Sequence, residues 1–522
     1  MSKRGRKSKR RMSRAPLRHR QDQAPEDAAM SDLESNNDDE EGSPRLRDDF
    51  WSILILLFLY ILQGIPIGLT ASVPMILQAR KVSYGNQALF SMATWPFSMK
   101  LLWAPLVDAL YIKDFGRRKT WVIPTQYLIG AFMLIFSQYS DVLLEGNEEP
   151  NVHVLTIIFF CLFFLTATQD IAVDGWALTM LSKRNVGYQS TCNSVGQTIG
   201  YFLAYVIFLA LESPHFCNKY LRSEPTSKGL VTLSDFMFFW GVVFVATTTL
   251  LWAFKREKPT ARSTDDTVSP LLVYKQSLDM LRRPVIRDYF IVILTSRIAF
   301  AGVDALTGLK LVEAGVPKEN LGLLAVPVIP VQIVLPIVVA RYTSGSRPMS
   351  AYLRAYPVRM GFGLLLPAFV AWSRRFDEYP LHFYVLAAVI YIAYSIPCTT
   401  QFVANMAFNA RIADPAIGAT YMTFCNTVNN VATTWPNTLA LALVEKFTWK
   451  YCDGGGALDG ATCVASEAEK ECLAAGGSCL THVDGYYVEV GLCLCVGLAW
   501  LSWMGRKMKR LQELDLSEWK LN

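Results

Sequence analysis

The stretch WSILILLFLYILQGIPIGLTASV, residues 51–73, decides the fold class because it contains no charged side chain. A helix needs about 20 apolar residues to cross the ~30 Å hydrocarbon core of a bilayer. Further apolar runs follow at 86–107, 121–140, 152–173, 188–211, 233–254, 287–308, 320–340, 355–373, 381–403, 416–443 and 485–505. The 522 residues are 52% hydrophobic and only 18% charged, with a mean hydropathy of +0.25. We therefore predict an all-α, polytopic membrane protein with twelve transmembrane helices in two six-helix halves.

The spacing of the runs divides the chain into five parts. We expect a disordered tail, a first half, a basic linker, a second half and a C-terminal tail. Their predicted bounds are 1–49, 50–254, 255–286, 287–505 and 506–522. The tail is rich in charge and poor in large apolar side chains, and the linker carries Pro, Ser, Thr and Asp.

Orientation follows from the distribution of Lys and Arg. These residues gather in the N-terminal tail, the linker, the C-terminal tail and the loops on the same side of the predicted spans. Cytoplasmic loops carry the excess of basic residues in membrane proteins. Both termini and the linker are therefore predicted to be cytoplasmic.

Cysteines indicate the compartment on the opposite side. The polar loop 444–484 contains four of them: Cys452, Cys463, Cys472 and Cys479. Such clustering is typical of two disulfides in an oxidising lumen, and the sequence leaves all three pairings open. Four free thiols or a zinc clasp is the alternative.

Ionisable side chains inside the spans are few, and each costs about 2.5–3.5 kcal/mol on insertion scales. We predict that the cations Lys100, Arg297 and Arg359 bind an anionic substrate, Arg359 from the start of the ninth span. The alternative is structural pairing, of Lys100 with Asp170 or Asp174, and of Arg297 with Asp304. Arg297 and Asp304 are seven residues apart, so a continuous helix would place them on one face.

Uncharged candidates accompany these cations. Gly64 and Pro66 predict a break in the first helix. Three prolines in the eighth run and Pro397 in the tenth predict similar breaks in those helices. Such breaks are tolerated at membrane depth where they line a cavity. We expect four side chains near these sites to contact substrate: Gln63, Trp103, Tyr391 and Trp435. Packing is the alternative role, because most aromatic side chains in spans serve it.

A second set of residues is predicted to gate or couple transport. Asp108 precedes the basic cluster Gly116-Arg117-Arg118-Lys119, and such charges can lock two helices at the cytoplasmic end. The alternative is an exposed basic loop. Asp170, Asp174 and Asp304 are the candidate acids, the first two sharing a helix face as a proton carrier or a gate-side network.

With these residues in view, the chain resembles the acetyl-coenzyme A transporters of the endoplasmic reticulum membrane, a branch of the major facilitator superfamily. The resemblance rests on GIPIGL at 64–69, WPFSMKLLWAPLVD at 95–108, GRRKTW at 116–121 and ATQDIAVDGWAL at 167–178, and similar runs occur in bacterial muropeptide permeases. It implies a carrier that moves acetyl-CoA from cytosol to lumen, where lysines of secretory proteins are acetylated. We also expect no cofactor, and we keep open both exchange of acetyl-CoA for CoA and assembly into a homodimer.

Two other functions are alternatives for these residues. The same cations would suit another bulky anion, such as glutathione disulfide or a nucleotide derivative. A membrane-embedded acyltransferase would need a base such as histidine inside a span, and the five histidines lie in loops, the tail or near span starts. No nucleotide-binding loop or DNA-reading motif occurs, so a pump or nucleic-acid binder is not expected.

Overall fold

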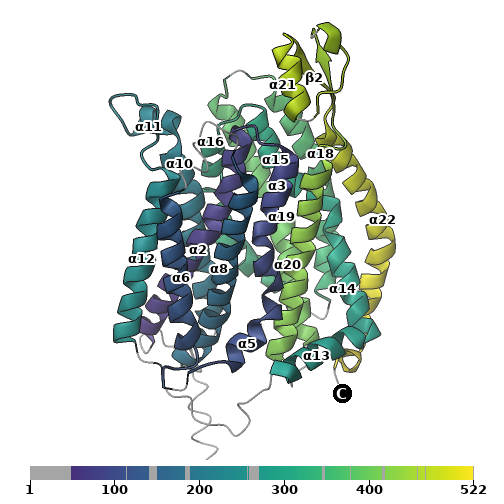
Figure 1. Ribbon diagram of the computed structural model, residues 1–522. Coiled ribbons are helices and arrows are strands. Elements are labelled where there is room, and N and C mark those ends of the chain that lie inside the picture. The colour runs from purple at the N-terminus through teal and green to yellow at the C-terminus, as the bar shows by residue number, and fades with distance from the viewer. Residues whose placement is uncertain are drawn as a thin grey trace, which may run out of the picture.

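The computed structural model describes residues 49–112, 114–139, 150–182, 188–255, 257, 270–343, 347–376, 378–413, 418–454, 456–464 and 466–520. Long helices run side by side between two ends of the molecule (Figure 1). The C-terminal face carries the chain end and the short helices α5 (Ala104–Ala109) and α13 (Pro270–Arg282). The hairpin face carries a small two-stranded sheet. Most of the predicted tail and linker fall outside the described residues.

Ten helical stretches of the described residues are long and apolar enough to cross a membrane. Most are single helices: α2 (Phe50–Ala79), α6 (Lys119–Ser137), α8 (Val152–Met180), α12 (Leu233–Phe254), α18 (Met349–Ser373), α19 (Leu381–Ile412) and α22 (Gly485–Glu513). The others are interrupted: α9 (Tyr188–Phe202) with η5 (Leu203–Ile207) and α10 (Phe208–Glu212), α14 (Pro284–Ser296) with η6 (Ile298–Phe300) and α15 (Ala301–Glu313), and α16 (Lys318–Leu323) with α17 (Val328–Thr343).

The two remaining apolar runs are also helical. Residues of the second run form α3 (Tyr84–Ser91), η2 (Met92–Thr94), α4 (Trp95–Met99), η3 (Lys100–Leu102) and α5. Pro96 and Pro105 each lie in the first turn of a segment, where a missing N–H is tolerated. The run at 416–443 forms α20 (Gly418–Leu443), whose Asn and Thr side chains reduce its hydropathy.

The predicted break in the first span is wrong, because α2 continues through Pro66. The Thr70 hydroxyl donates to the Pro66 carbonyl at 2.8 Å, a local bond that accompanies the helix past the proline. Gly64 serves close packing instead: a Cβ there would lie 2.8 Å from the Cα of Gly200 in α9. The break predicted in the eighth run is present, since Pro327 precedes α17, whereas α19 continues through Pro397.

Two groups of helices meet along the middle of the molecule. We call α2–α12 the first helix group and α14–α22 the second helix group. Helix α3 lies beside α20, and α2 packs against α15 (Figure 1). Ala88 of α3 is buried in the apolar core formed by Val303, Leu306 and their neighbours in the second group. The residue bounds predicted for the two halves stay a prediction.

The remaining elements cap the two ends. Helix α11 (Pro214–Tyr220), β1 (Trp449–Asp453), η8 (Gly456–Leu458), α21 (Ser466–Ala474) and β2 (Ser478–Val483) belong to the hairpin face, and η9 (Leu516–Trp519) follows α22. Strands β1 and β2 are antiparallel, with Cys452 opposite Cys479. Trp519 of η9 is buried against Tyr289 and Phe408, which fixes the end of the chain to the second group.

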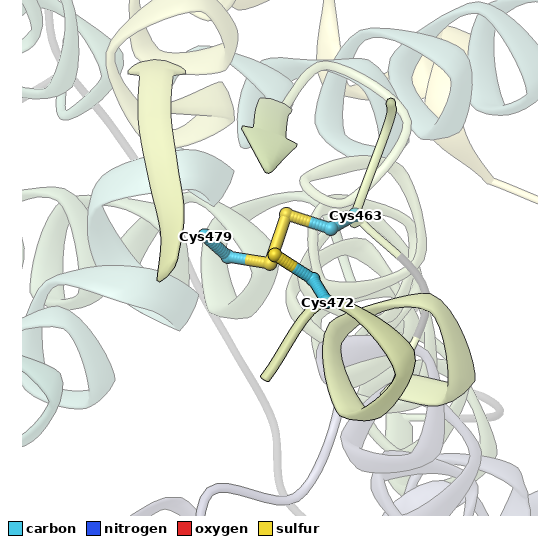
Figure 2. Close-up of side chains that lie close together, drawn as sticks. All are labelled: Cys463, Cys472 and Cys479. Carbon is cyan, nitrogen blue, oxygen red and sulfur yellow. A yellow bond between two sulfur atoms is a disulfide. The ribbon is translucent and has the colours of Figure 1, made fainter. Parts of the chain in front are cut away.

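Disulfides form the interior of the hairpin. Cys452 is bonded to Cys472, and Cys463 to Cys479. The sulfurs of Cys463, Cys472 and Cys479 lie within 4.8 Å of one another (Figure 2), a spacing that thiolates could use for a metal. Because each of these sulfurs is in a disulfide here, none is a thiolate ligand. The disulfides stand in for an apolar core in this small segment.

We expect non-reducing peptide mapping to recover the links Cys452–Cys472 and Cys463–Cys479. The bonds span 20 and 16 residues, and closing loops of this size contributes about 3 kcal/mol each in the chain-entropy view. Reduction should therefore expose residues 444–484 to protease while the helices stay intact. Free, alkylatable thiols at all four positions in the native protein would contradict this pairing.

Candidate functional site

Lys100 lies at the break between α4 and α5, facing α8. Its ammonium forms an ion pair with Asp170, one of the two partners weighed from the sequence. Gln63 of α2 donates to the same carboxylate at 2.5 Å. The Asp170 side chain is 2% exposed and the Lys100 side chain 17% exposed, so Lys100 is the more accessible member of the ion pair. Three segments of the first helix group thus converge on one carboxylate.

Asp174 lies one turn further along α8 and has separate partners. The Tyr60 hydroxyl donates to its Oδ1 at 2.7 Å, and the Asn193 amide donates at 3.2 Å. Because these donors come from α2 and α9, Asp174 links three helices of the first group. The structure places it in a structural network, and a coupling role for Asp170 and Asp174 stays a prediction.

Arg359 is the most fully bonded cation in the membrane region described. Its guanidinium donates to Asp304 at 2.6 Å, to Gln401 at 2.8 Å and to the Tyr394 hydroxyl at 3.2 Å. It also lies 4.1 Å from the ring centroid of Phe300. The prediction that Arg359 begins its helix is wrong, since α18 starts ten residues earlier, at Met349, and the side chain is 3% exposed.

Arg297 does not pair with Asp304 as the alternative interpretation held. Helix α14 ends at Ser296 and a 3₁₀ turn follows, so the one-face relation of a continuous helix is lost. Asp304 binds Arg359 and Tyr394 instead. Among the described residues, no hydrogen bond or ion pair of the Arg297 side chain is found. The Arg297 guanidinium therefore has N–H donors that no described residue accepts.

Two of the predicted aromatic contacts are committed to packing. The Trp103 indole donates to Thr168 at 3.1 Å and its ring lies 4.7 Å from that of Phe164. The Trp435 indole donates to the Leu294 carbonyl at 3.1 Å. Both rings have satisfied donors, so each anchors neighbouring helices in this conformation.

Two tyrosines of the first helix group form a stacked aromatic pair. Tyr201 and Tyr205 stack at 5.2 Å with planes 27° apart, across the start of a π-helical turn. Tyr391 of α19 is 46% exposed. Tyr391 is a residue predicted from the sequence, whereas Tyr201 and Tyr205 are not. Their spacing of four in the fifth run was the available signal, and π-turns often mark functional sites.

A cavity of about 290 Å³ lies between the two helix groups. Asp304 and Gly308 of α15 line it on one side, and Pro74 and Met75 of α2 on the other. Its remaining walls are mostly hydroxyl and amide side chains: Ser91, Thr94, Thr433, Thr434, Asn437 and Thr438. Since Asp304 also binds Arg359, the buried charge network of the second group borders this space.

Bonds between the groups close the hairpin face. Lys318 pairs with Glu212 at 2.7 Å. Ser213, the next residue, donates to Glu319 at 2.7 Å. On the opposite edge, the Tyr84 hydroxyl donates to Glu313 at 2.5 Å. The residues in these three contacts are not among those predicted from the sequence, because the two members of each contact are far apart along the chain.

A charge cluster supports that closure from within the second group. The Lys310 ammonium lies 2.8 Å from Glu313, 3.0 Å from Asp484 and 4.8 Å from the ring centroid of Tyr84. Arg374 binds the other oxygen of Asp484 at 2.6 Å. Burial alone would raise the pKa of Asp484, but the two cations and the Tyr486 N–H hold it below its usual range.

Replacing Asp484 with asparagine is expected to destabilise the protein by roughly 1.5–3 kcal/mol at pH 7, because buried Lys310 loses one of its two carboxylates and keeps Glu313. A depressed carboxyl pKa contributes stability that is present above its unfolded value, near 3.9, and is lost as pH falls through the lower folded value. The stability difference between wild type and variant should therefore begin to shrink near pH 4 and disappear only below the folded pKa of Asp484. A difference that persists unchanged into acid would contradict this. Asp279→Asn, at an exposed pair, is the control.

The basic cluster 116–119 binds a carboxylate that the sequence analysis missed. The backbone N–H groups of Arg118 and Lys119, at the start of α6, donate to Glu257 at 3.1 Å. The Lys119 ammonium donates to the carbonyls of Trp252 and Lys255 at the end of α12. The side chain of Asp108, the predicted partner, lies outside the described residues. The cluster therefore links α6 to the end of α12, and its role in gating stays a prediction.

Comparisons with known proteins agree with this architecture. A family model described as acetyl-coenzyme A transporter 1 matches residues 52–269, 260–376 and 365–521. The chain is 35% identical over 483 residues to an uncharacterized protein of Schizosaccharomyces pombe, covering 90% of this chain and 89% of that one. It is 31% identical over 547 residues to an uncharacterized membrane protein of Saccharomyces cerevisiae, covering 91% and 98%.

More distant proteins share part of the chain or the fold alone. The anhydromuropeptide permease of Escherichia coli is 25% identical over 190 residues, covering 33% of this chain and 37% of the permease. The nucleoside transporter NupG superposes with a TM-score of 0.54 at 12% identity, over 86% of this chain and 98% of NupG. A bacterial homolog of the lysosomal transporter Spinster, in an inward-facing conformation, gives 0.54 at 13%, over 91% and 99%. The fold class is confirmed as that of the major facilitator transporters, and the chain belongs to the acetyl-coenzyme A transporter 1 family.

Proposed function

We propose that this transporter moves acetyl-CoA from the cytosol into the lumen of the endoplasmic reticulum, where it supplies acetyl groups for lumenal proteins. The match of the family model from residue 52 to 521 is the observation that carries the proposal. The cations and tyrosines at the centre of the molecule supply chemistry that suits such a substrate.

Acetyl-CoA presents phosphate oxygens and an adenine ring. Arg297 has guanidinium donors available for phosphate, and Lys100 has an accessible edge beside its partner Asp170. The stacked pair Tyr201 and Tyr205 offers aromatic faces for adenine. Arg359, with three protein acceptors, positions Asp304 and Tyr394.

Access to this centre requires movement of the two helix groups. A cavity of about 290 Å³ falls at the lower limit of pockets that hold drug-sized ligands, and acetyl-CoA is larger. The bonds at Glu212, Ser213 and Tyr84 close the hairpin face. We infer that substrate enters from the C-terminal face and leaves after these bonds break, by rocking of one group against the other.

The proposed orientation places the C-terminal face in the cytosol. Lys and Arg concentrate on that side in the sequence. The opposite face carries the disulfides Cys452–Cys472 and Cys463–Cys479, which persist in an oxidising lumen.

Uptake of labelled acetyl-CoA into liposomes containing the purified protein tests the substrate. We expect saturable uptake, accelerated by CoA loaded inside and competed by unlabelled acetyl-CoA more strongly than by glutathione disulfide or a nucleotide. Uptake equal to that of empty liposomes would overturn the proposal, and stronger competition by another anion would reassign the substrate. Arg297→Gln should raise the KM, because the side chain has no structural bond to lose among the described residues.

The tyrosine pair gives a separate test of adenine binding. Tyr205→Leu is expected to raise the KM for acetyl-CoA by roughly 5- to 100-fold, since base stacking on an aromatic ring is worth about 1–3 kcal/mol. Tyr205→Phe keeps the ring and should retain the KM. Competition by CoA fragments with and without adenine provides the measurement: the Leu variant should lose the preference for the adenine-bearing fragment. An unchanged preference would remove Tyr205 from the site.

A further inference from the structure

A second cavity lies outside the candidate transport site, between α18 and α22 near the C-terminal face. It has a volume of about 520 Å³. Three cations line it, Arg354 from α18 and Arg506 and Lys509 from α22, together with uncharged side chains that include Leu353 and Leu501. A pocket of this size accommodates a lipid head group.

No carboxylate of the described residues pairs with any of the three cations. Within the described chain, no ion pair is found for Arg354, Arg506 or Lys509, and the only side-chain bond of Arg354 goes to the Ser350 carbonyl at 3.2 Å. The nearby cations Arg347 and Lys507 do have acidic partners, Glu513 at 3.5 Å and Asp288 at 2.9 Å. The uncompensated positive charge is therefore concentrated on the pocket.

Contacts between α18 and α22 hold the walls of the pocket in place. The Gln512 amide donates to the Ser350 hydroxyl at 3.2 Å, which ties the end of α22 to the start of α18. Gly505 is buried, and a Cβ there would lie 3.6 Å from the end of the Leu353 side chain, so α18 and α22 are in van der Waals contact beside the pocket. The cations thus project from a fixed helix pair.

The position of the pocket points to a lipid rather than a soluble anion. On α22, Leu498 is 59% exposed one turn before Ser502, which lines the pocket, and Trp503 beside it is 75% exposed. On α18, Val358 is 55% exposed one turn beyond Arg354. Both helices change there from exposed apolar to exposed cationic residues, and exposed Trp is typical of the interface with lipid head groups. The mouth of the pocket therefore lies at head-group depth.

We propose that this pocket binds the phosphorylated head group of an anionic membrane lipid. A phosphomonoester offers several acceptor oxygens to two guanidinium groups and one ammonium. Leu353 and Leu501 would contact the glycerol and upper acyl atoms, which a soluble phosphate lacks. Basic pockets between transmembrane helices are a recurrent mode of lipid recognition. The proposal is independent of what the transporter carries.

Native mass spectrometry of the full-length protein tests it with three lipids: phosphatidylinositol 4-phosphate, phosphatidylinositol and phosphatidylcholine. We expect the monophosphate to bind at least tenfold more tightly than the other two. Combined Arg354→Gln, Arg506→Gln and Lys509→Gln should weaken it by roughly a hundredfold. The matched control removes three exposed cations elsewhere on the same face, Lys275→Gln, Arg282→Gln and Arg287→Gln, and should change binding less than twofold.

Two outcomes would overturn the proposal. One is equal loss, or no loss, in the pocket and control variants. The other is equally tight binding of soluble inositol 1,4,5-trisphosphate, which would assign the pocket to a free phosphate. Thermal unfolding verifies that each variant is folded. If the triple variant does not fold, the single variant Arg506→Gln tests the lipid proposal in its place. We expect it to weaken binding about fivefold.

Discussion

Replacing Arg359 with glutamine is expected to reduce transport by at least a hundredfold and to destabilise the protein by about 3–5 kcal/mol. The substitution removes the guanidinium that binds Asp304, Gln401 and Tyr394, and it leaves a carboxylate unpaired beside the cavity. Arg359→Lys should recover little, because one ammonium does not reproduce a planar fork with three acceptors. Uptake per folded protein in liposomes is the measurement.

A second substitution separates stability from transport. Arg359→Gln combined with Asp304→Asn removes both charges, so we expect the unfolding temperature to recover while uptake stays low. Recovery of uptake in the double variant would show that the pair only holds the helices together. Full activity of Arg359→Gln alone would contradict the positioning role of this residue.

Lys100→Met should have the next largest effect, a loss of about 3–5 kcal/mol in stability, because Asp170 is 2% exposed and would keep, among the described residues, only the Gln63 amide as a donor. Lys100→Met with Asp170→Asn is expected to regain most of that stability. Thermal unfolding measures this, and uptake decides whether Lys100 also binds substrate. If the single variant is as stable as the wild type, the ion pair is not the structural element described here.

The sequence predicted the membrane fold well because lipid imposes a simple rule. Every span must hide its backbone polar groups in a helix, so apolar runs translate directly into helices. The same reasoning singled out Lys100 and Asp170, since charges inside spans need partners. Their pairing was one of two alternatives, and only the three-dimensional placement of α8 selects Asp170 over Asp174.

Prediction from helical spacing was wrong where the helix is interrupted. Arg297 and Asp304 share a face only if the seventh span is continuous, and the 3₁₀ turn after Ser296 rotates them apart. Nothing local in the sequence signals this turn, which contains neither Gly nor Pro. Conversely, Pro66 lies within an unbroken α2, where α9 packs tightly against it at Gly64.

Long-range partners were the other feature that the sequence could not supply. Glu257 binds the start of α6, and Lys318 binds Glu212, across more than a hundred positions in each case. Such pairs depend on which helices become neighbours, which residue spacing does not encode. The contacts that join the two groups at the hairpin face are therefore known only from the structure. In the transport hypothesis, these are the contacts that must break to release substrate.

Cross-linking the two helix groups at the hairpin face tests alternating access most directly. Ser213→Cys and Glu319→Cys place thiols where the native side chains meet at 2.7 Å, and a short bifunctional methanethiosulfonate would join them. The control, Asp288→Cys with Lys507→Cys, joins two helices within the second group at a 2.9 Å ion pair. We predict that the first cross-link stops acetyl-CoA uptake and that the second does not. Undiminished uptake with the hairpin face locked would contradict transport by separation of the two groups.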